Sequence, residues 1–184
     1  MNSCKSGNNN KLETKKKTNP VDLGQISALP DSFRFPADNP PNKTKIELGR
    51  LLFYDPILSG SKDVSCATCH HPEFMYAESQ EISIGVNGKG LGEHRKFNSP
   101  DDIPFTKRSA QSLLNTAFNG IDVDGNYTPE KAPMFWDLRA SGLEAQAQLP
   151  IKTFEEMRGH LFEEAQISDV VVKRLTAITA YRNL

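Results

Sequence analysis

The sequence has few cysteines, almost no net charge and no long apolar run. Its formal net charge is −1, so it lacks the basic surface that nucleic acids or acidic membranes attract. No apolar run approaches the roughly 18 residues that a membrane-spanning helix needs. The chain has 184 residues, which is long enough for one domain with a hydrophobic core. We therefore expect a water-exposed domain and no nucleic-acid partner.

Only three cysteines are present, and two of them belong to the motif Cys-Ala-Thr-Cys-His at residues 66–70. Two thiols one helical turn apart can add to the two vinyl groups of a haem. The histidine that follows can then bind the iron as the proximal ligand. The motif predicts one covalently bound c-type haem, attached through Cys66 and Cys69 and ligated by His70.

Two other uses of the cysteines fit less well. A structural zinc site needs four nitrogen or sulfur ligands, usually from a second pair at similar spacing. The histidines His94 and His160 are single and distant from the motif. A thioredoxin-type dithiol normally follows a βαβ pattern, but no apolar strand precedes Ser65. Haem attachment is therefore the favoured interpretation.

The N-terminal region is polar. Residues 1–19 are rich in Asn and Lys, and prolines punctuate the stretch that follows. We expect residues 1–40 to form a flexible tether and an extended approach. No signal peptide is present, although haem attachment takes place outside the bacterial cytoplasmic membrane, so we expect the true N-terminus to be missing. Ser3-Cys4 resembles the end of a lipoprotein signal, and a solvated tail with an incidental cysteine is an equal alternative.

Helix signals follow this region. The stretch Thr44–Glu47 matches a capping box, and Asp55-Pro56 should end the helix near Tyr54. Ser65 is suited to cap the short helix that carries the haem cysteines. We expect residues 72–106 to form a long irregular loop around the cofactor, because a loop of this length inside a domain is usually functional.

Three more helices are expected further along the chain. One covers Ala110–Phe118, a second opens at the capping box that begins with Ser141 and is stopped by Pro150, and Ser168 caps the last. The predicted fold is mainly α, a cytochrome c-like haem domain with long irregular loops. We assign it to residues 41–184.

From about Leu48 onward the sequence resembles the bacterial di-haem cytochrome c peroxidases and their MauG-type relatives. The resemblance covers the N-terminal, peroxidatic haem domain, which we expect to be incomplete at its C-terminal end. Ordered sequence blocks carry it: Leu48–Pro56, Leu58–Gly60, Val64–His70, Ser83–Gly85, Lys107–Asn115, Phe135–Ala140, Leu143–Ala147, Pro150–Ile151 and Glu156–Met157.

The resemblance implies an enzyme that reduces hydrogen peroxide to water in the periplasm or cell envelope. Electrons would come from a small redox protein, a cytochrome c or a cupredoxin, through a second haem domain that this chain lacks. A lipid anchor at Cys4 and a homodimer are left open. Two alternatives remain: MauG-like oxidation of a partner protein's side chains, and a single-haem c-type electron carrier without catalysis.

The resemblance also implies roles for three catalytic residues. Glu156 would be the general acid/base that moves a proton between the two peroxide oxygens; viewed alone, it is an ordinary solvated helix residue. Gln146 would orient peroxide or water, although it could also be an exposed helix residue. Trp136, the only tryptophan, would conduct electrons between the haems, or simply pack as a core aromatic.

Some positions depart from the family pattern. Val86 stands where many members have a distal histidine ligand, which implies a site that is open without prior reduction. His94 could substitute as that ligand. Ser109 stands where members often have Asn at a calcium site, so calcium is not assigned. Arg139 is expected to pair with Asp137 or with a haem propionate.

Overall fold

The computed structural model describes residues 28–98, 102–122 and 124–184. The chain divides between Pro30 and Asp31 into two units. The start of the haem domain at residue 41 stays a prediction. Most of the expected tether, with Cys4, lies outside the described residues. No helix in the described ranges is long and apolar enough to cross a membrane.

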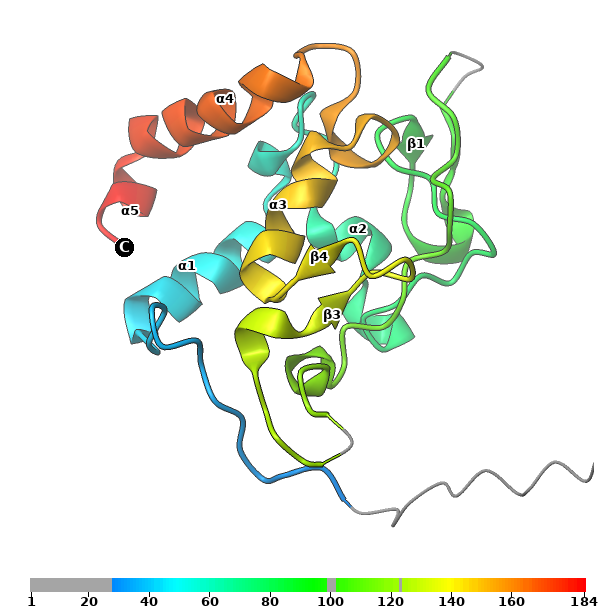
Figure 1. Cartoon of the computed structure of the whole chain (residues 1–184). Coiled ribbons are helices and arrows are strands. Elements are labelled where there is room, and N and C mark those ends of the chain that lie inside the picture. Colours follow the sequence, from blue (N-terminus) through cyan, green and yellow to red (C-terminus); the bar gives the residue numbers. More distant parts are fainter. Residues whose placement is uncertain (1–27, 99–101, 123) are drawn as a thin grey trace, which may run out of the picture. The chain divides into compact units, whose positions relative to one another are not determined.

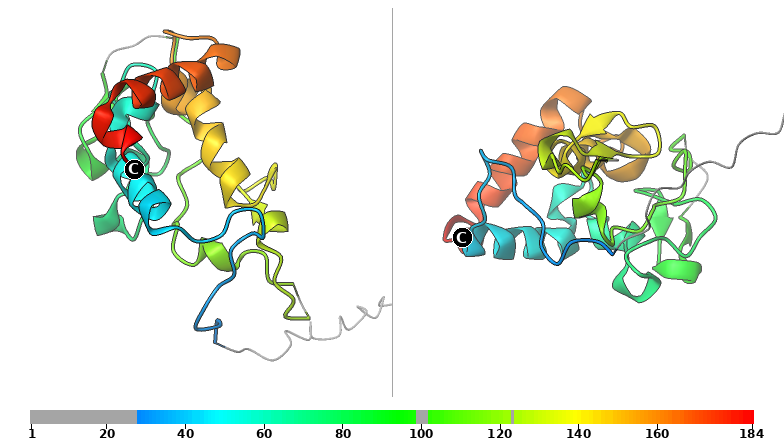
Figure 2. Two further views of the ribbon diagram at one scale, coloured as in Figure 1. Left: turned by 90° about the vertical axis from the view of Figure 1, so that its left-hand side faces the viewer. Right: turned by 60° about the horizontal axis from the view of Figure 1, so that its bottom comes forward.

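The second unit is mainly helical, as predicted, with two short hairpins (Figure 1). Helices α3 and α4 pack against each other and α1 contacts α2 (Figure 2). The elements follow in the order α1 (Lys43–Tyr54), α2 (Cys66–Cys69), β1 (Gly88–Lys89), β2 (Lys96–Phe97), β3 (Pro133–Met134), β4 (Ala140–Ser141), α3 (Leu143–Lys152), α4 (Glu164–Ala177) and α5 (Thr179–Arg182).

Helix α1 confirms the first predicted helix, but its cap differs. The side-chain oxygen of Asn42 accepts the backbone N–H groups of Thr44 and Lys45, at 2.9 and 3.2 Å. Asn42 therefore satisfies two of the free N–H groups of the first turn, and the predicted cap at Thr44 is wrong. The helix ends at Tyr54, as expected.

Helix α2 is a single turn that carries both haem-motif cysteines. Ser65 precedes it as the N-cap, as predicted. Its backbone N–H donates to Oγ1 of Thr68 at 3.0 Å, and the N–H of Thr68 donates back to the Ser65 carbonyl at 3.0 Å. This pair of bonds holds the turn through neighbouring residues alone.

The two predicted later helices exist with different boundaries. Helix α3 continues to Lys152, so Pro150 does not stop it. Proline removes one backbone donor, yet the N–H of Thr153 still reaches the carbonyl of Leu149 at 3.0 Å. Helix α4 begins at Glu164 rather than at Ser168, because the N–H of Glu163 donates to the Gln166 side chain at 3.1 Å.

The predicted helix over Ala110–Phe118 is wrong. Only Thr116–Phe118 forms a 3₁₀ turn. The preceding backbone is paired elsewhere: the carbonyl of Ala110 accepts the N–H of Glu78 at 3.3 Å, and the N–H of Leu113 donates to the Tyr76 carbonyl at 3.2 Å. Backbone groups used between segments cannot also form helical bonds.

Residues 72–106 are irregular, as expected, with β1 and β2 as a short antiparallel pair; positions 99–101 are not described. The second hairpin pairs Pro133 with Ser141 and Met134 with Ala140. Its connection contains two non-glycine residues with positive φ, Phe135 and Leu138. The sequence did not predict this hairpin, which carries Trp136 and Asp137.

The main hydrophobic cluster lies beside the site. Met157, which is 4% exposed, packs with Ile167 and Val171 of α4, and Ile57, Leu58 and Val64 complete the cluster. Met157 belongs to a five-residue π-helical turn, Phe154–Arg158, which we call the π turn. The cluster therefore fixes the segment that bears Glu156.

Candidate haem and peroxide site

A cavity of about 450 Å³ lies within the second unit. Its volume is within the range of small-molecule and cofactor sites. One wall is formed by α2 and the end of α1, and the opposite wall by α3 and the π turn. Its lining includes Cys66, Cys69, His70, Lys107, Arg108, Trp136, Asp137, Arg139, Gln146, Glu155 and Glu156.

The two motif cysteines are free thiols on the cavity wall. Burial raises the pKa of the Cys66 thiol, and it raises the pKa of Cys69 to about 12, with a further increase from the nearby carboxyl of Glu78. A redox-active Cys-x-x-Cys pair has a lowered thiol pKa instead. Buried neutral thiols disfavour the thioredoxin interpretation and suit thioether attachment.

His70 follows the helix and lines the same cavity. Its Nδ1 lies 3.1 Å from the carbonyl oxygen of Tyr76, a bond that assigns the proton to Nδ1. Burial lowers the pKa of His70, although the carbonyls of Tyr76 and Gln111 oppose the shift. The neutral form of the ring is thus favoured, and the bond from Nδ1 to Tyr76 leaves Nε2 as the nitrogen suited to bind iron.

The chemistry of this wall fits a covalently attached haem. Two unpaired thiols and one oriented neutral imidazole border a single cavity, which is the donor set that c-type haem requires. Within the described ranges, no group of three or more His, Cys, Asp or Glu side chains could hold a separate metal ion. The hydroxyl of Ser109, at the position where family members often bind calcium through Asn, donates to the carbonyl of Gln80 at 3.2 Å.

The opposite wall carries two adjacent carboxyl groups. Burial raises the pKa of Glu156, and the charge of Glu155 adds to this, whereas Arg139 and Lys107 lower it. The side chain of Glu155 is 12% exposed, and Oε1 lies 3.7 Å from Nζ of Lys107. The two carboxyls therefore differ: Glu155 is ion-paired, and Glu156 holds its proton more strongly than an ordinary glutamate.

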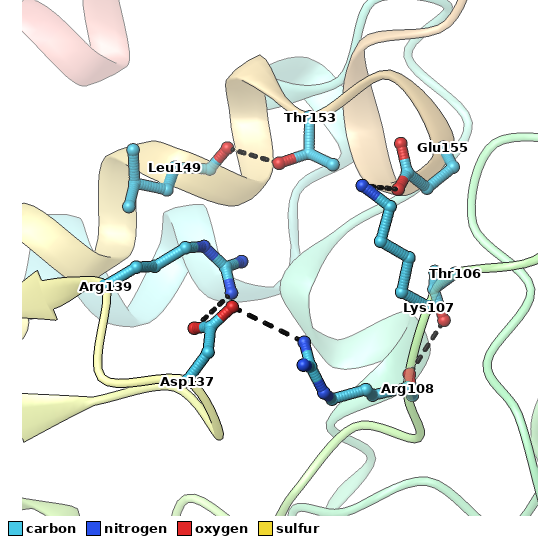
Figure 3. A network of polar contacts seen from close by, with 8 residues as sticks. All are labelled: Thr106, Lys107, Arg108, Asp137, Arg139, Leu149, Thr153 and Glu155. Atoms are coloured by element: carbon cyan, nitrogen blue, oxygen red, sulfur yellow. Dashed lines mark hydrogen bonds and ion pairs between the residues drawn. The ribbon is translucent and has the colours of Figure 1, made fainter.

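A charged network around Asp137 borders the same cavity, and Figure 3 shows it together with the Lys107–Glu155 pair. Asp137 accepts from Arg139 at 2.9 Å and from Arg108 at 3.5 Å. The bond from Arg139 is the main cause of the lowered pKa of Asp137. The guanidinium of Arg139 also lies 3.7 Å from the centre of the Phe135 ring. Arg139 thus pairs with Asp137, one of its two expected partners.

The other predicted catalytic residues also line the cavity. Gln146 projects from α3 and is half-buried. Trp136 belongs to the β3–β4 connection and is 66% exposed, so it is not a core aromatic in this chain. The sequence does not single out Lys107 or Glu155, and the only signal for Glu155 is a charge next to Glu156.

Val86, at the position of the usual distal histidine, and His94, the candidate substitute ligand, lie elsewhere. Val86 packs against the main hydrophobic cluster, and its Cγ2 lies close to Gly159. The His94 side chain is 86% exposed and lies 3.7 Å from the carboxylate of Glu93. Neither residue lines the cavity.

Known proteins match most of the chain. A family model described as di-haem cytochrome c peroxidase matches residues 43–184. Methylamine utilization protein MauG from Methylorubrum extorquens is 33% identical over 166 residues, which is 89% of this chain and 37% of that protein. Cytochrome c551 peroxidase from Nitrosomonas europaea is 29% identical over 146 residues, or 79% and 34% of the two chains.

A solved structure has a similar fold. A MauG-like protein associated with microbial copper homeostasis matches with a TM-score of 0.56 and 28% identity, over 87% of this chain and 39% of that one. The chain therefore spans only a little over a third of the length of these proteins. The match confirms the predicted cytochrome c-like fold and the covalently bound c-type haem. With a family model that covers residues 43–184, this chain belongs to the di-haem cytochrome c peroxidase family.

Proposed function

We propose that this chain is the peroxide-reducing haem half of a cell-envelope cytochrome c peroxidase, with Glu156 as its acid/base. One observation carries the proposal: the half-buried carboxyl of Glu156, with a raised pKa, shares a cavity with Cys66, Cys69 and His70. The haem held by these three residues supplies an iron for peroxide and a path for electrons. Hydrogen peroxide takes up two electrons and two protons and leaves as two water molecules.

Glu156 is suited to move a proton during this reaction. Its pKa is raised toward neutral pH, so the carboxyl is suited both to accept and to donate a proton. The charges of Arg139 and Lys107 act in the opposite direction, so the carboxyl can also ionise. It takes a proton from one peroxide oxygen and delivers it to the other as the O–O bond breaks. General acid–base catalysis of this kind contributes about 10²–10⁴-fold.

Two further residues have proposed roles around Glu156. Gln146 borders the same cavity and can orient peroxide or water through its amide. Trp136 lines the cavity and is 66% exposed, so its ring can contact both the cofactor and a second domain or protein. We propose it as the route for electrons from a second haem domain, supplied by a cytochrome c or cupredoxin.

The proposal is tested with the variant Glu156→Gln and the unmodified chain, each matured with haem in a periplasmic expression system. The measurement is the rate at which hydrogen peroxide changes the haem absorption spectrum. We expect a high-spin ferric spectrum in both proteins, and a rate at least about 100-fold lower in the variant. Glu81→Gln, at an exposed position outside the cavity lining, should react like the unmodified chain. A rate within a few-fold of it in Glu156→Gln removes the acid/base assignment.

A second function has support from one feature, the exposed Trp136. A MauG-like enzyme would oxidise side chains of a partner protein, and an indole that is 66% exposed beside the cavity offers a route for electrons from that partner. Trp136→Phe tests this route. Peroxide reduction with a small chemical donor should persist, and oxidation of a protein partner should fall. A spectrum that is low-spin and indifferent to peroxide would favour the single-haem electron carrier instead.

A further inference from the structure

The π turn lies between two glycines from distant loops. A Cβ atom at Gly60 would lie 1.9 Å from the carbonyl oxygen of Arg158, and one at Gly85 would lie 2.0 Å from that of Glu155 and 2.5 Å from that of Glu156. Neither glycine has a positive φ, so backbone conformation alone would accept alanine. The glycines are therefore needed for close approach to the two ends of the turn.

The Gly85 loop is held by a buried arginine. Arg95 is 4% exposed, and its guanidinium donates to the backbone carbonyl oxygens of Ile84, Gly85 and Gly90. The bonds from Nε to Ile84 and from Nη1 to Gly90 measure 2.6 and 2.9 Å. One planar group with five donors thus ties three points of a loop that has little regular structure.

The Gly60 loop is held in the same way from α4. The guanidinium of Arg174 donates to the carbonyl oxygens of Ile57, Ser59 and Gly60, at 3.1, 2.6 and 2.8 Å. The N–H of Gly60 in turn donates to the carbonyl of Met157 at 2.8 Å. A chain of hydrogen bonds therefore runs from Arg174 to the residue next to Glu156.

The two arrangements act on an element that needs support. Isolated π-helical turns are rare, and they occur mostly at functional sites. We propose that Arg95 and Arg174 are positioning residues for Glu156: each fixes one glycine loop, and Gly85 and Gly60 hold the two ends of the π turn so that the carboxyl faces the cavity. The proposal rests on the proposed function of Glu156.

The first test uses Gly85→Ala in the haem-loaded chain, with Gly49→Ala as the matched control. A Cβ at Gly49 meets nothing within 4 Å. We expect Gly85→Ala to speed amide hydrogen exchange in peptides that cover residues 154–159. We also expect it to slow the reaction with peroxide by about 10–100-fold, because a displacement of about 1 Å can cost that much. If both quantities match those of Gly49→Ala, the proposal is wrong.

A double variant shows whether the effect passes through Glu156. In a Glu156→Gln background, Gly85→Ala should cause less than about a twofold further loss of rate, because the group that it misplaces is already removed. Losses that multiply would mean a general structural effect and would overturn the positioning role. If Glu156→Gln itself keeps the full rate, the proposed function fails. The exchange measurement then decides alone whether the glycines and arginines hold the turn.

The arginines are tested by Arg95→Lys and Arg174→Lys, with the exposed Arg50→Lys as control. A lysine keeps the charge but cannot reproduce a planar fork that reaches three carbonyls. Both variants should increase exchange over residues 154–159 and slow the peroxide reaction by about 3–30-fold. If Gly85→Ala does not take up haem, the same two measurements are made on these variants and on Gly60→Ala instead. Unchanged exchange in both lysine variants contradicts the proposal.

Discussion

The two walls of the cavity are built in opposite ways. The haem-attachment wall is local: Cys66, Cys69 and His70 lie within five residues, and the turn that presents them is capped by Ser65. The wall that bears Glu156 is assembled from distant segments. The haem-attachment wall therefore depends on a local motif, whereas the wall that bears Glu156 depends on tertiary contacts.

The largest effect should come from breaking the local wall. Replacing both motif cysteines, Cys66→Ser with Cys69→Ser, removes the atoms that form thioether bonds. We expect complete loss of covalently bound haem, measured by haem staining after denaturing electrophoresis. Cys4→Ser, outside the motif, should keep the stain. Haem that stays on the denatured double variant would contradict the attachment assignment.

A change at the start of α3 tests the assembled wall. Gly142 precedes the helix with φ 81° and ψ 156°, a region that is accessible essentially to glycine alone. Gly142→Ala should lower the free energy of unfolding by about 1–3 kcal/mol, measured by denaturant unfolding. Gly49→Ala, inside α1, should have no cost, because alanine favours a helix interior. If the two variants had equal free energies of unfolding, the backbone conformation at Gly142 would not require glycine.

The pH dependence of stability provides a further distinction between the walls. The raised pKa of Glu156 means that the folded chain binds its proton more tightly than the unfolded chain. Its contribution to stability is therefore full at low pH and falls as the pH rises from the ordinary glutamate range through the folded pKa. Glu156→Gln cannot titrate, so we expect it to gain stability relative to the unmodified chain as pH rises. A constant difference between pH 4 and 8, in denaturant unfolding, would contradict the shift.

The smallest effect is expected at the edge of the assembled wall. Lys107 is 84% exposed and lies 3.7 Å from the carboxylate of Glu155. Lys107→Met should lower the free energy of unfolding by about 0.2–1 kcal/mol, because the lysine end of the pair is exposed to solvent and such pairs contribute little. The loss should shrink in high salt, which screens exposed charges. A loss of several kcal/mol that is independent of salt would mean that the pair is effectively buried.

The same contrast explains what the sequence could predict. Helix α1 and the Ser65 cap depend on neighbouring residues, and their predictions are confirmed. The family match confirms the covalently bound haem, and its attachment through Cys66 and Cys69 with His70 as ligand stays a prediction. The resemblance identified Glu156, and the structure places it on the cavity wall. Its roles in proton transfer, and those of Gln146 and Trp136, stay predictions.

The wrong predictions involve backbone that is bonded over long distances. Ala110 and Leu113 have helix-compatible surroundings in sequence, but their backbone groups bond to Glu78 and Tyr76. The glycine approaches to the π turn are equally invisible in sequence, since Gly60 and Gly85 look like ordinary loop glycines. No local sequence pattern indicates which distant segment a backbone carbonyl or an arginine side chain will contact.

The number of residues in the π turn also determines the direction in which the Glu156 side chain points. The carbonyl of Thr153 accepts N–H groups from both Met157 and Arg158, at 3.2 and 3.0 Å, so the turn holds one residue more than an α-helical turn. Each residue of an α-helix advances the side-chain direction by about 100°. Deleting a single residue here would therefore change the direction of the side chains in this segment. The carboxyl of Glu156 would point away from the cavity, even if every remaining side chain were kept.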